Sequence, residues 1–97
     1  MRVAVIGQGY VGLTISVGAL TAGHSVVGVD HSASVVDGLR RGHSHIEGIS
    51  GAEFGSGIRA GLFYPTTTYD EITSAEVVVI AVPTPLDSAG KIGRAHV

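Results

Sequence analysis

The sequence opens with a short apolar run that is followed at once by three closely spaced glycines. Val3–Ile6 is continuously apolar, which is typical of a strand buried on both faces. The next six residues, Gly7-Gln8-Gly9-Tyr10-Val11-Gly12, have the spacing G-x-G-x-x-G. Apolar residues then recur at helical spacing until Gly23, a suitable helix stop; they are Val11, Ile15, Ala19 and Ala22. A strand that turns directly into a helix indicates an α/β fold.

Strand and helix patterns continue to alternate along the chain. Ser25–Asp30 predicts a second strand that is apolar until its last residue. Ser34 is the predicted N-cap of a second helix, which ends at Gly42. Its predicted buried residues are Val35, Val36 and Leu39.

The second half contains two further strand patterns. Residues 43–60 are glycine-rich, and a loop with a short helix is expected there. Residues 62–67 and 77–82 predict the third and fourth strands, with one or two helical turns at 69–75 between them. This order predicts a Rossmann-type doubly wound parallel sheet, truncated after about four strands, with strand order 3-2-1-4. The fourth strand would leave an apolar edge uncovered.

Composition narrows the possible functions. The 97 residues suit one small domain, and a formal charge of −2 argues against binding to nucleic acid. The chain has no cysteine, which excludes disulfides, thiolate metal sites and a cysteine nucleophile within it. No segment has the ~18 apolar residues of a membrane span, and the N-terminus is unlike a signal peptide. We therefore expect a cytoplasmic protein.

The glycine motif is the strongest chemical signal. Gly7 permits the tight turn out of the strand, Gly9 lets a pyrophosphate approach the backbone, and Gly12 lets the helix pack closely. The free N–H groups at the helix N-terminus favour an anion. Asp30 ends the second strand at nearly the ~20-residue distance at which an acid accepts hydrogen bonds from an adenosine ribose. Because an acid there repels a 2′-phosphate, the pattern favours NAD over NADP.

A second motif, Val82-Pro83-Thr84-Pro85, follows the fourth strand. Ligands of open α/β sheets lie beyond the carboxyl ends of the strands, where the strand order reverses. We therefore expect this proline-stiffened loop to flank the same crevice, with Thr84 offering a hydroxyl to the cofactor. The predicted cofactor-binding residues are Gly7, Gln8, Gly9, Tyr10, Val11, Gly12, Asp30, Pro83 and Thr84.

Two histidines, His43 and His45, share a loop in the glycine-rich segment. Two histidines alone are a poor ligand set for a metal, so a polar loop is the favoured interpretation. Glu47 and Asp87 have no visible partner in the sequence. We assign no metal-binding and no catalytic residue in this chain.

Three stretches together resemble the N-terminal domain of the UDP-glucose/GDP-mannose dehydrogenase family. They are Val5-Ile6-Gly7-Gln8-Gly9-Tyr10-Val11-Gly12-Leu13, Val27-Gly28-Val29-Asp30 and Val79-Ile80-Ala81-Val82-Pro83-Thr84-Pro85-Leu86-Asp87. His45-Ile46-Glu47, with Ile49-Ser50, further resembles the branch that acts on UDP-N-acetylhexosamines. The resemblance covers residues 1–91.

The resemblance implies an activity for a longer parent protein. The family oxidises C6 of a nucleotide sugar to a carboxylate with two NAD⁺, through a catalytic cysteine that lies far beyond this chain. It implies that Tyr10, Val11, Asp30 and Thr84 contact NAD. The expected partner is a UDP-sugar bound elsewhere in the parent, which we expect to be a homo-oligomer; the fragment alone is expected to be inactive.

The family pattern breaks after Gly90-Lys91, where proline and aspartate usually follow. The last six residues, Ile92-Gly93-Arg94-Ala95-His96-Val97, are what one reading frame of a common sequencing-library adapter encodes. We therefore expect residues 92–97 to be a non-native tail, and residues 1–91 to be the N-terminal part of an NAD-binding domain.

Two other functions remain open from the sequence. One is a nucleotide-sensing regulatory module of a channel or transporter, which also uses a glycine loop and a strand-end acid. The other is a different NAD-dependent hydroxy-acid or acyl-CoA dehydrogenase of the same fold. Fold alone does not decide between them.

Overall fold

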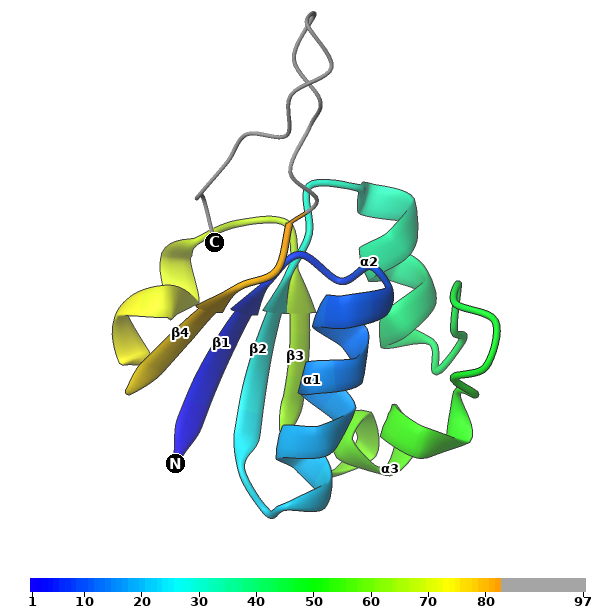
Figure 1. Cartoon of the computed structure of the whole chain (residues 1–97), viewed down its shortest axis with the longest axis horizontal. Coiled ribbons are helices and arrows are strands. Elements are labelled where there is room, and N and C mark those ends of the chain that lie inside the picture. Colours follow the sequence, from blue (N-terminus) through cyan, green and yellow to red (C-terminus); the bar gives the residue numbers. More distant parts are fainter. Residues whose placement is uncertain (83–97) are drawn as a thin grey trace, which may run out of the picture.

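All four strands of the sheet are parallel and lie in the order β3-β2-β1-β4. They are β1 (Arg2–Ile6), β2 (Ser25–Val29), β3 (Phe63–Thr66) and β4 (Val77–Ile80). The computed structural model describes residues 1–82, so Pro83, Thr84 and the predicted tail 92–97 lie outside the described residues. The predicted strand order is confirmed, and the carboxyl ends of the strands lie together at the top of the sheet in Figure 1.

The helices divide unequally between the two faces of the sheet (Figure 1). One face is covered by α1 (Tyr10–Thr21), α2 (Ala33–Arg40) and α3 (Ala52–Ala60). The short 3₁₀ helix η1 (Asp70–Ser74) covers the other face, where Ile72 packs on Ala4, Val27 and Val29. Alternate residues of β1 and of β2 therefore enter two different cores.

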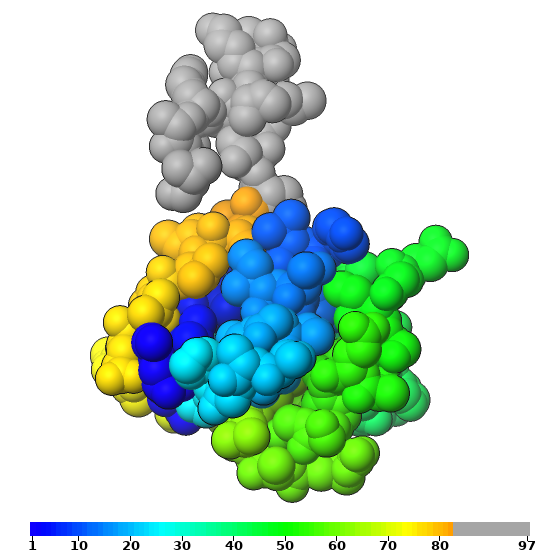
Figure 2. All heavy atoms as spheres, turned by 60° about the horizontal axis from the view of Figure 1, so that its bottom comes forward, coloured from blue at the N-terminus to red at the C-terminus, as the bar shows by residue number. Residues whose placement is uncertain are grey.

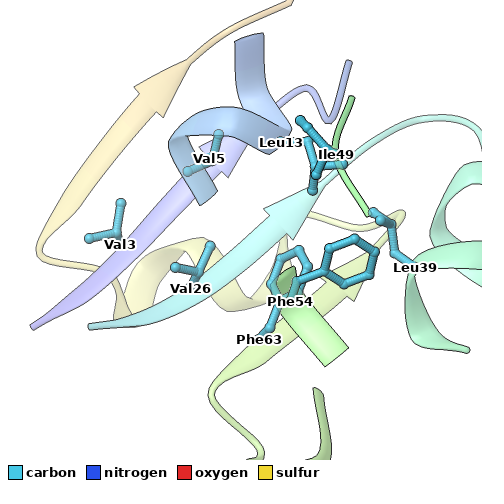
Figure 3. Close-up of a cluster of buried hydrophobic side chains, with 8 residues drawn as sticks. All are labelled: Val3, Val5, Leu13, Val26, Leu39, Ile49, Phe54 and Phe63. Atoms are coloured by element: carbon cyan, nitrogen blue, oxygen red, sulfur yellow. The ribbon is translucent and has the colours of Figure 1, made fainter. Parts of the chain in front are cut away.

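The larger core lies between the sheet and the three α-helices (Figure 3). The rings of Phe54 in α3 and Phe63 in β3 meet edge to face, with their centroids 5.8 Å apart. Leu13 of α1 and Leu39 of α2 are fully buried in the same cluster. Each helix thus contributes at least one large apolar side chain to a shared core.

The first helix, α1, packs closely on the glycine-rich loop at Gly12. A Cβ atom on Gly12 would lie 1.7 Å from the carbonyl oxygen of Gly7, so only glycine fits there. The buried residues of α1 are Gly12, Leu13 and Ser16. The predicted helix is confirmed, but the apolar residues at helical spacing do not all face the core, because Val11 is 56% exposed and Ala22 is exposed. The close approach at Gly12 sets the rotation of the helix instead.

The structure defines where α2 begins and places a third helix in the glycine-rich segment 43–60. The side chain of Ser32 accepts a hydrogen bond from the Val35 N–H at 3.3 Å, so Ser32 is the N-cap and the predicted cap at Ser34 was wrong. The predicted burial of Val36 and Leu39 is confirmed, whereas Val35 is only partly buried. The third helix, α3, approaches α1 closely because Gly57 lies against Leu20.

The outer edge of β4 is apolar and exposed, as the sequence predicted. Val77, Val78 and Ile80 are 42–57% exposed. Figure 2 shows β4 and η1, in orange and yellow, along one side of the molecule and α3, in green, on the other. No helix within residues 1–82 is long and apolar enough to cross a membrane.

The leucines test the larger core directly. Leu39 is fully buried, whereas Leu62 is 41% exposed. Leu39→Ala should lower the free energy of unfolding by about 2–5 kcal/mol, because it leaves a cavity. Leu62→Ala removes the same atoms and should cause a clearly smaller loss. Urea denaturation followed by circular dichroism measures both, and equal midpoints would contradict the assigned core.

Substitutions at two glycines of α1 test the contact between this helix and the glycine-rich loop: Gly12 lies in the contact, and Gly18 is the control. Gly12→Ala should disrupt the glycine-rich loop, since its Cβ collides with the Gly7 carbonyl. Gly18→Ala should raise stability by up to about 1 kcal/mol, because its Cβ meets nothing within 4 Å and alanine favours helix. Thermal melting of both variants compares them, and a Gly12→Ala protein as stable as the wild type would refute the close approach.

Candidate functional site

Two adjoining hollows flank the glycine-rich loop at the carboxyl edge of the sheet. The first has a volume of about 420 Å³ and is lined by Ile6, Gly7, Gly9, Val29, Asp30, His31, Tyr69 and Val82. The second, of about 350 Å³, is lined by Gly9, Tyr10, Val11, Ala81 and Val82. Because Gly9 and Val82 line both, the two hollows form one crevice at the ends of β1, β2 and β4. This is where ligands bind in open α/β sheets.

The turn out of β1 requires glycine at its first position. Gly7 has a φ of +97°, and its N–H donates to the Val29 carbonyl oxygen at 2.6 Å. A Cβ on Gly7 would lie 2.9 Å from the carbonyl group of Ala81, which follows β4. The loop is therefore wedged between the ends of β2 and β4, and any side chain here would force them apart.

The N-terminus of α1 is open toward the crevice. Its N-cap residue is Gly9, and no side chain from residues 1–82 caps the helix there. The first turn contains no acidic residue, and a Cβ on Gly9 would meet nothing within 4 Å. The first N–H groups of a helix have no intrahelical acceptor and carry the positive end of its dipole. This end of α1 is thus suited to a phosphate group.

Asp30 lies at the end of β2 beside the loop. One carboxylate oxygen accepts from the Gln8 N–H at 2.8 Å, and the other accepts from the Ser32 N–H at 2.9 Å. The side chain is 13% exposed and lines the larger hollow. An ionised carboxylate has about four acceptor sites, so two remain for hydroxyl donors in the hollow. The arrangement holds a fixed negative charge beside the loop.

Gln8 is fully buried, and all its polar atoms have protein partners. Its side-chain Nε2 donates to the carbonyl oxygens of Val5 and Gly7, and its Oε1 accepts from the Ser16 hydroxyl. Its backbone N–H donates to Asp30, and its carbonyl oxygen contacts Nε2 of His45. The buried side chain of Gln8 therefore positions the glycine-rich loop, and the cofactor contact predicted for Gln8 from the motif stays a prediction.

The other predicted residues lie at several places around the crevice. Tyr10 and Val11 are 65% and 56% exposed and line the smaller hollow. Gly12 is buried beneath the loop, where it allows the close helix packing that the motif predicts. Pro83 and Thr84 follow directly after Val82, which lines both hollows.

The structure also brings residues to the crevice that the sequence analysis did not select. His31 and Tyr69 line the larger hollow, and both are exposed. Tyr69 follows the carboxyl end of β3, so the predicted sheet order was a signal that could have found it. Within residues 1–82, no three His, Cys, Asp or Glu side chains gather as a candidate metal site.

Comparison with known proteins gives a consistent result. The profile described as UDP-glucose/GDP-mannose dehydrogenase family, NAD binding domain, matches residues 1–97. A UDP-glucose 6-dehydrogenase from Haloferax volcanii is 36% identical over 92 residues, which are 95% of this chain and 21% of the relative. A GDP-mannose 6-dehydrogenase from Pseudomonas putida is 38% identical over an alignment that covers 100% of this chain and 23% of the relative.

Solved structures of family members are similar to this chain in fold and in sequence. A ternary complex of GDP-mannose dehydrogenase from Pseudomonas aeruginosa superimposes with a TM-score of 0.88 at 32% identity, covering 95% of this chain and 22% of that one. A UDP-glucose dehydrogenase from Pyrobaculum islandicum gives 0.85 at 33% identity, with 94% and 22% covered. The chain therefore spans about a fifth of the length of its relatives, and it belongs to the UDP-glucose/GDP-mannose dehydrogenase family, whose NAD-binding domain it matches.

Proposed function

We propose that this chain is the NAD-binding N-terminal part of a UDP-sugar 6-dehydrogenase. The observation that carries the proposal is the crevice, in which an uncapped helix N-terminus and a strand-end carboxylate lie on either side of one glycine-rich loop. A dinucleotide has a matching order of groups, a ribose diol next to a diphosphate. Membership of a family defined by its NAD-binding domain supports the same ligand.

The larger hollow suits the adenosine half of the cofactor. Asp30 lines it with acceptor sites to spare, so its carboxylate can accept from the two ribose hydroxyls. The remaining wall is largely apolar, with Ile6, Val29 and Tyr69. An apolar wall with a few polar groups at its edge, here Asp30 and His31, is suited to a flat base joined to a sugar.

The diphosphate fits the N-terminus of α1. Gly9 leaves open space beside its backbone, and the first turn carries no acid that would repel an anion. Tyr10 and Val11 then flank the smaller hollow, which we assign to the nicotinamide side. Pro83 and Thr84 remain cofactor contacts that the sequence alone predicts. NAD, when bound, supplies the hydride acceptor of the reaction.

The parent reaction that we propose converts a C6 hydroxyl to a carboxylate. Each turnover consumes one water and two NAD⁺ and releases two NADH and three protons, so the oxidation takes place in two hydride transfers. This chain holds and orients the cofactor for those transfers. It supplies no cysteine nucleophile, because none of its 97 residues is a cysteine.

The substrate and setting complete the proposal. Relatives named for UDP-glucose, GDP-mannose and UDP-N-acetyl-D-mannosamine match at 36%, 38% and 37% identity. We favour a UDP-sugar because of the His45-Ile46-Glu47 segment. We also propose a cytoplasmic, homo-oligomeric parent. The family match favours a dehydrogenase over the regulatory module that the sequence left open.

Cofactor choice tests the role of Asp30. The 97-residue chain should bind NAD more tightly than NADP, because the carboxylate accepts from a ribose 2′-hydroxyl and repels a 2′-phosphate. Asp30→Asn should weaken NAD binding about tenfold, the loss expected for one charge-assisted hydrogen bond. Isothermal titration calorimetry with both dinucleotides measures these affinities.

Asp37→Asn is the matched control for this substitution. Asp37 is exposed on α2 and pairs with Arg41, away from the residues that line the crevice. Its NAD affinity should equal that of the wild type. Equal binding of NAD and NADP by the wild type, or an Asp30→Asn variant with unchanged affinity, would count against the assigned ribose site.

The separation of binding from catalysis gives a further test. The 97-residue chain should bind NAD and yet produce no NADH from UDP-glucose or a UDP-N-acetylhexosamine, since it carries no cysteine. NADH absorbance in the presence of each sugar nucleotide measures turnover. Sustained NADH formation by the pure chain would show that its own residues catalyse the oxidation, which the proposal excludes.

A further inference from the structure

The loop between α2 and α3 is held in a defined shape at its base. We call residues 43–50 the strap. A Cβ on Gly51 would lie 1.8 Å from the Gly42 carbonyl oxygen, so the two backbones touch where the strap begins and ends. The Gly42 φ of +80° turns the chain at the same point. The strap is therefore closed by two glycines that accept this contact without a side chain.

Side chains fix the strap internally and against the core. The Ser44 hydroxyl donates to the Ile46 carbonyl oxygen at 3.0 Å and accepts from the Ile46 N–H at 3.1 Å. Ile49 is 9% exposed and belongs to the larger core, and Ile46 packs against that core. His45 lies between Ser44 and Ile46, and these two residues are held by the hydrogen bonds and the packing just described. The backbone of His45 therefore has little freedom to move.

His45 reaches from the strap to the glycine-rich loop. Its Nε2 atom lies 2.5 Å from the carbonyl oxygen of Gln8, which is 37 residues away in sequence. A carbonyl oxygen only accepts hydrogen bonds, so Nε2 must carry the proton. This contact joins a segment outside the glycine motif to the peptide group between Gln8 and Gly9.

We propose that His45 is a positioning residue for the dinucleotide, acting through the Gln8–Gly9 peptide. This inference rests on the proposed NAD site. Gly9 lines both hollows, and the atom that His45 holds belongs to the peptide that ends in the Gly9 N–H. A hydrogen bond accepted by a carbonyl polarises its peptide and strengthens the N–H as a donor. His45 thereby orients and strengthens a donor at the phosphate position.

His45 and Asp30 bind opposite sides of the Gln8 backbone. Asp30 accepts from the Gln8 N–H, while His45 donates to the Gln8 carbonyl oxygen. The Gln8 backbone is thus fixed on both sides by side chains from different segments, after β2 and after α2. Loss of the His45 side chain frees only the Gln8 carbonyl oxygen, while Asp30 still accepts from the Gln8 N–H. The glycine-rich loop should therefore keep its fold, but the Gln8–Gly9 peptide should be less well oriented.

The test compares histidine variants of the 97-residue chain by NAD titration. His45→Ala should weaken NAD binding about 3- to 10-fold, the range expected for one hydrogen bond. His45→Gln should restore most of the affinity, because its amide Nε2 can donate in the same place. His43→Ala is the matched control, because His43 is exposed in the same strap, as His45 is, but only His45 contacts the Gln8 carbonyl oxygen. The His43→Ala chain should bind NAD as the wild type does.

A spectroscopic readout separates positioning from general stability. The Gly9 amide signal in a ¹⁵N–¹H spectrum should shift in His45→Ala and stay in place in His43→Ala, because only His45 contacts the Gln8 carbonyl. In the wild type at mildly alkaline pH, long-range ¹⁵N–¹H correlations should show the proton on Nε2 of His45. A neutral ring protonated on Nδ1 would overturn the inference without any variant.

The remaining outcomes also decide between the two proposals. NAD binding that His45→Ala leaves unchanged overturns the positioning role and leaves the proposed function intact. If His45→Ala does not fold, His45→Gln decides instead: a folded His45→Gln chain that binds NAD weakly also overturns the positioning role. A folded wild-type chain with no affinity for NAD overturns the proposed function itself.

Discussion

The glycine-rich loop depends on one buried amide. Gln8 carries a polar side chain at a position with no solvent exposure, and burial of an unpaired amide would cost several kcal/mol, about 2–7. The cost is offset because the side chain satisfies the carbonyl oxygens of Val5 and Gly7 and the hydroxyl of Ser16. These partners come from the end of β1, the turn and the second turn of α1. The buried network therefore ties the strand to the helix across the turn, and it keeps the loop backbone available at the crevice.

Glycine at three positions makes this network sterically possible. Because Gly12 has no side chain, the Gly7 carbonyl group can lie against α1. Because Gly7 has none, the backbone of Ala81 at the end of β4 can lie against the loop. Gly28 in β2 leaves room for the Gln8 side chain, since a Cβ there would lie 2.9 Å from its amide carbon and from the Phe63 ring. Gly28 lies outside the G-x-G-x-x-G pattern. The motif thus describes the side of the loop that lines the crevice, while Gly28 of β2 provides the space for the Gln8 side chain behind the loop.

The sequence predicts most of the fold, and it selects Gly7, Gly9 and Asp30 of the crevice lining. Continuous apolar runs at β1, β2 and β4 are strong signals because parallel strands are usually covered on both faces, and their alternation with helices predicted the observed sheet order. The run at β4 marks the strand correctly, although most of its residues are exposed. The N-cap at Ser32 and the rotation of α1 were missed, since local pattern does not record the clash between Gly12 and Gly7. The roles of Gln8 and His45 depend on partners up to 37 residues away, and pairing at that distance leaves no periodic signal.

The edge strand connects the stability of the sheet with the site. Val78 and Ile80 are exposed on β4, yet the residues that follow, Ala81 and Val82, line the crevice. The Ala81 N–H donates to the Ile6 carbonyl oxygen at 2.7 Å, which holds this end of β4 beside the glycine-rich loop. An uncovered apolar edge is costly for a sheet, and the pairing of β4 with β1 is what keeps that wall in place. Because β4 belongs both to the exposed edge and to the wall of the crevice, the stability of this edge strand and the shape of the crevice depend on the same pairing with β1.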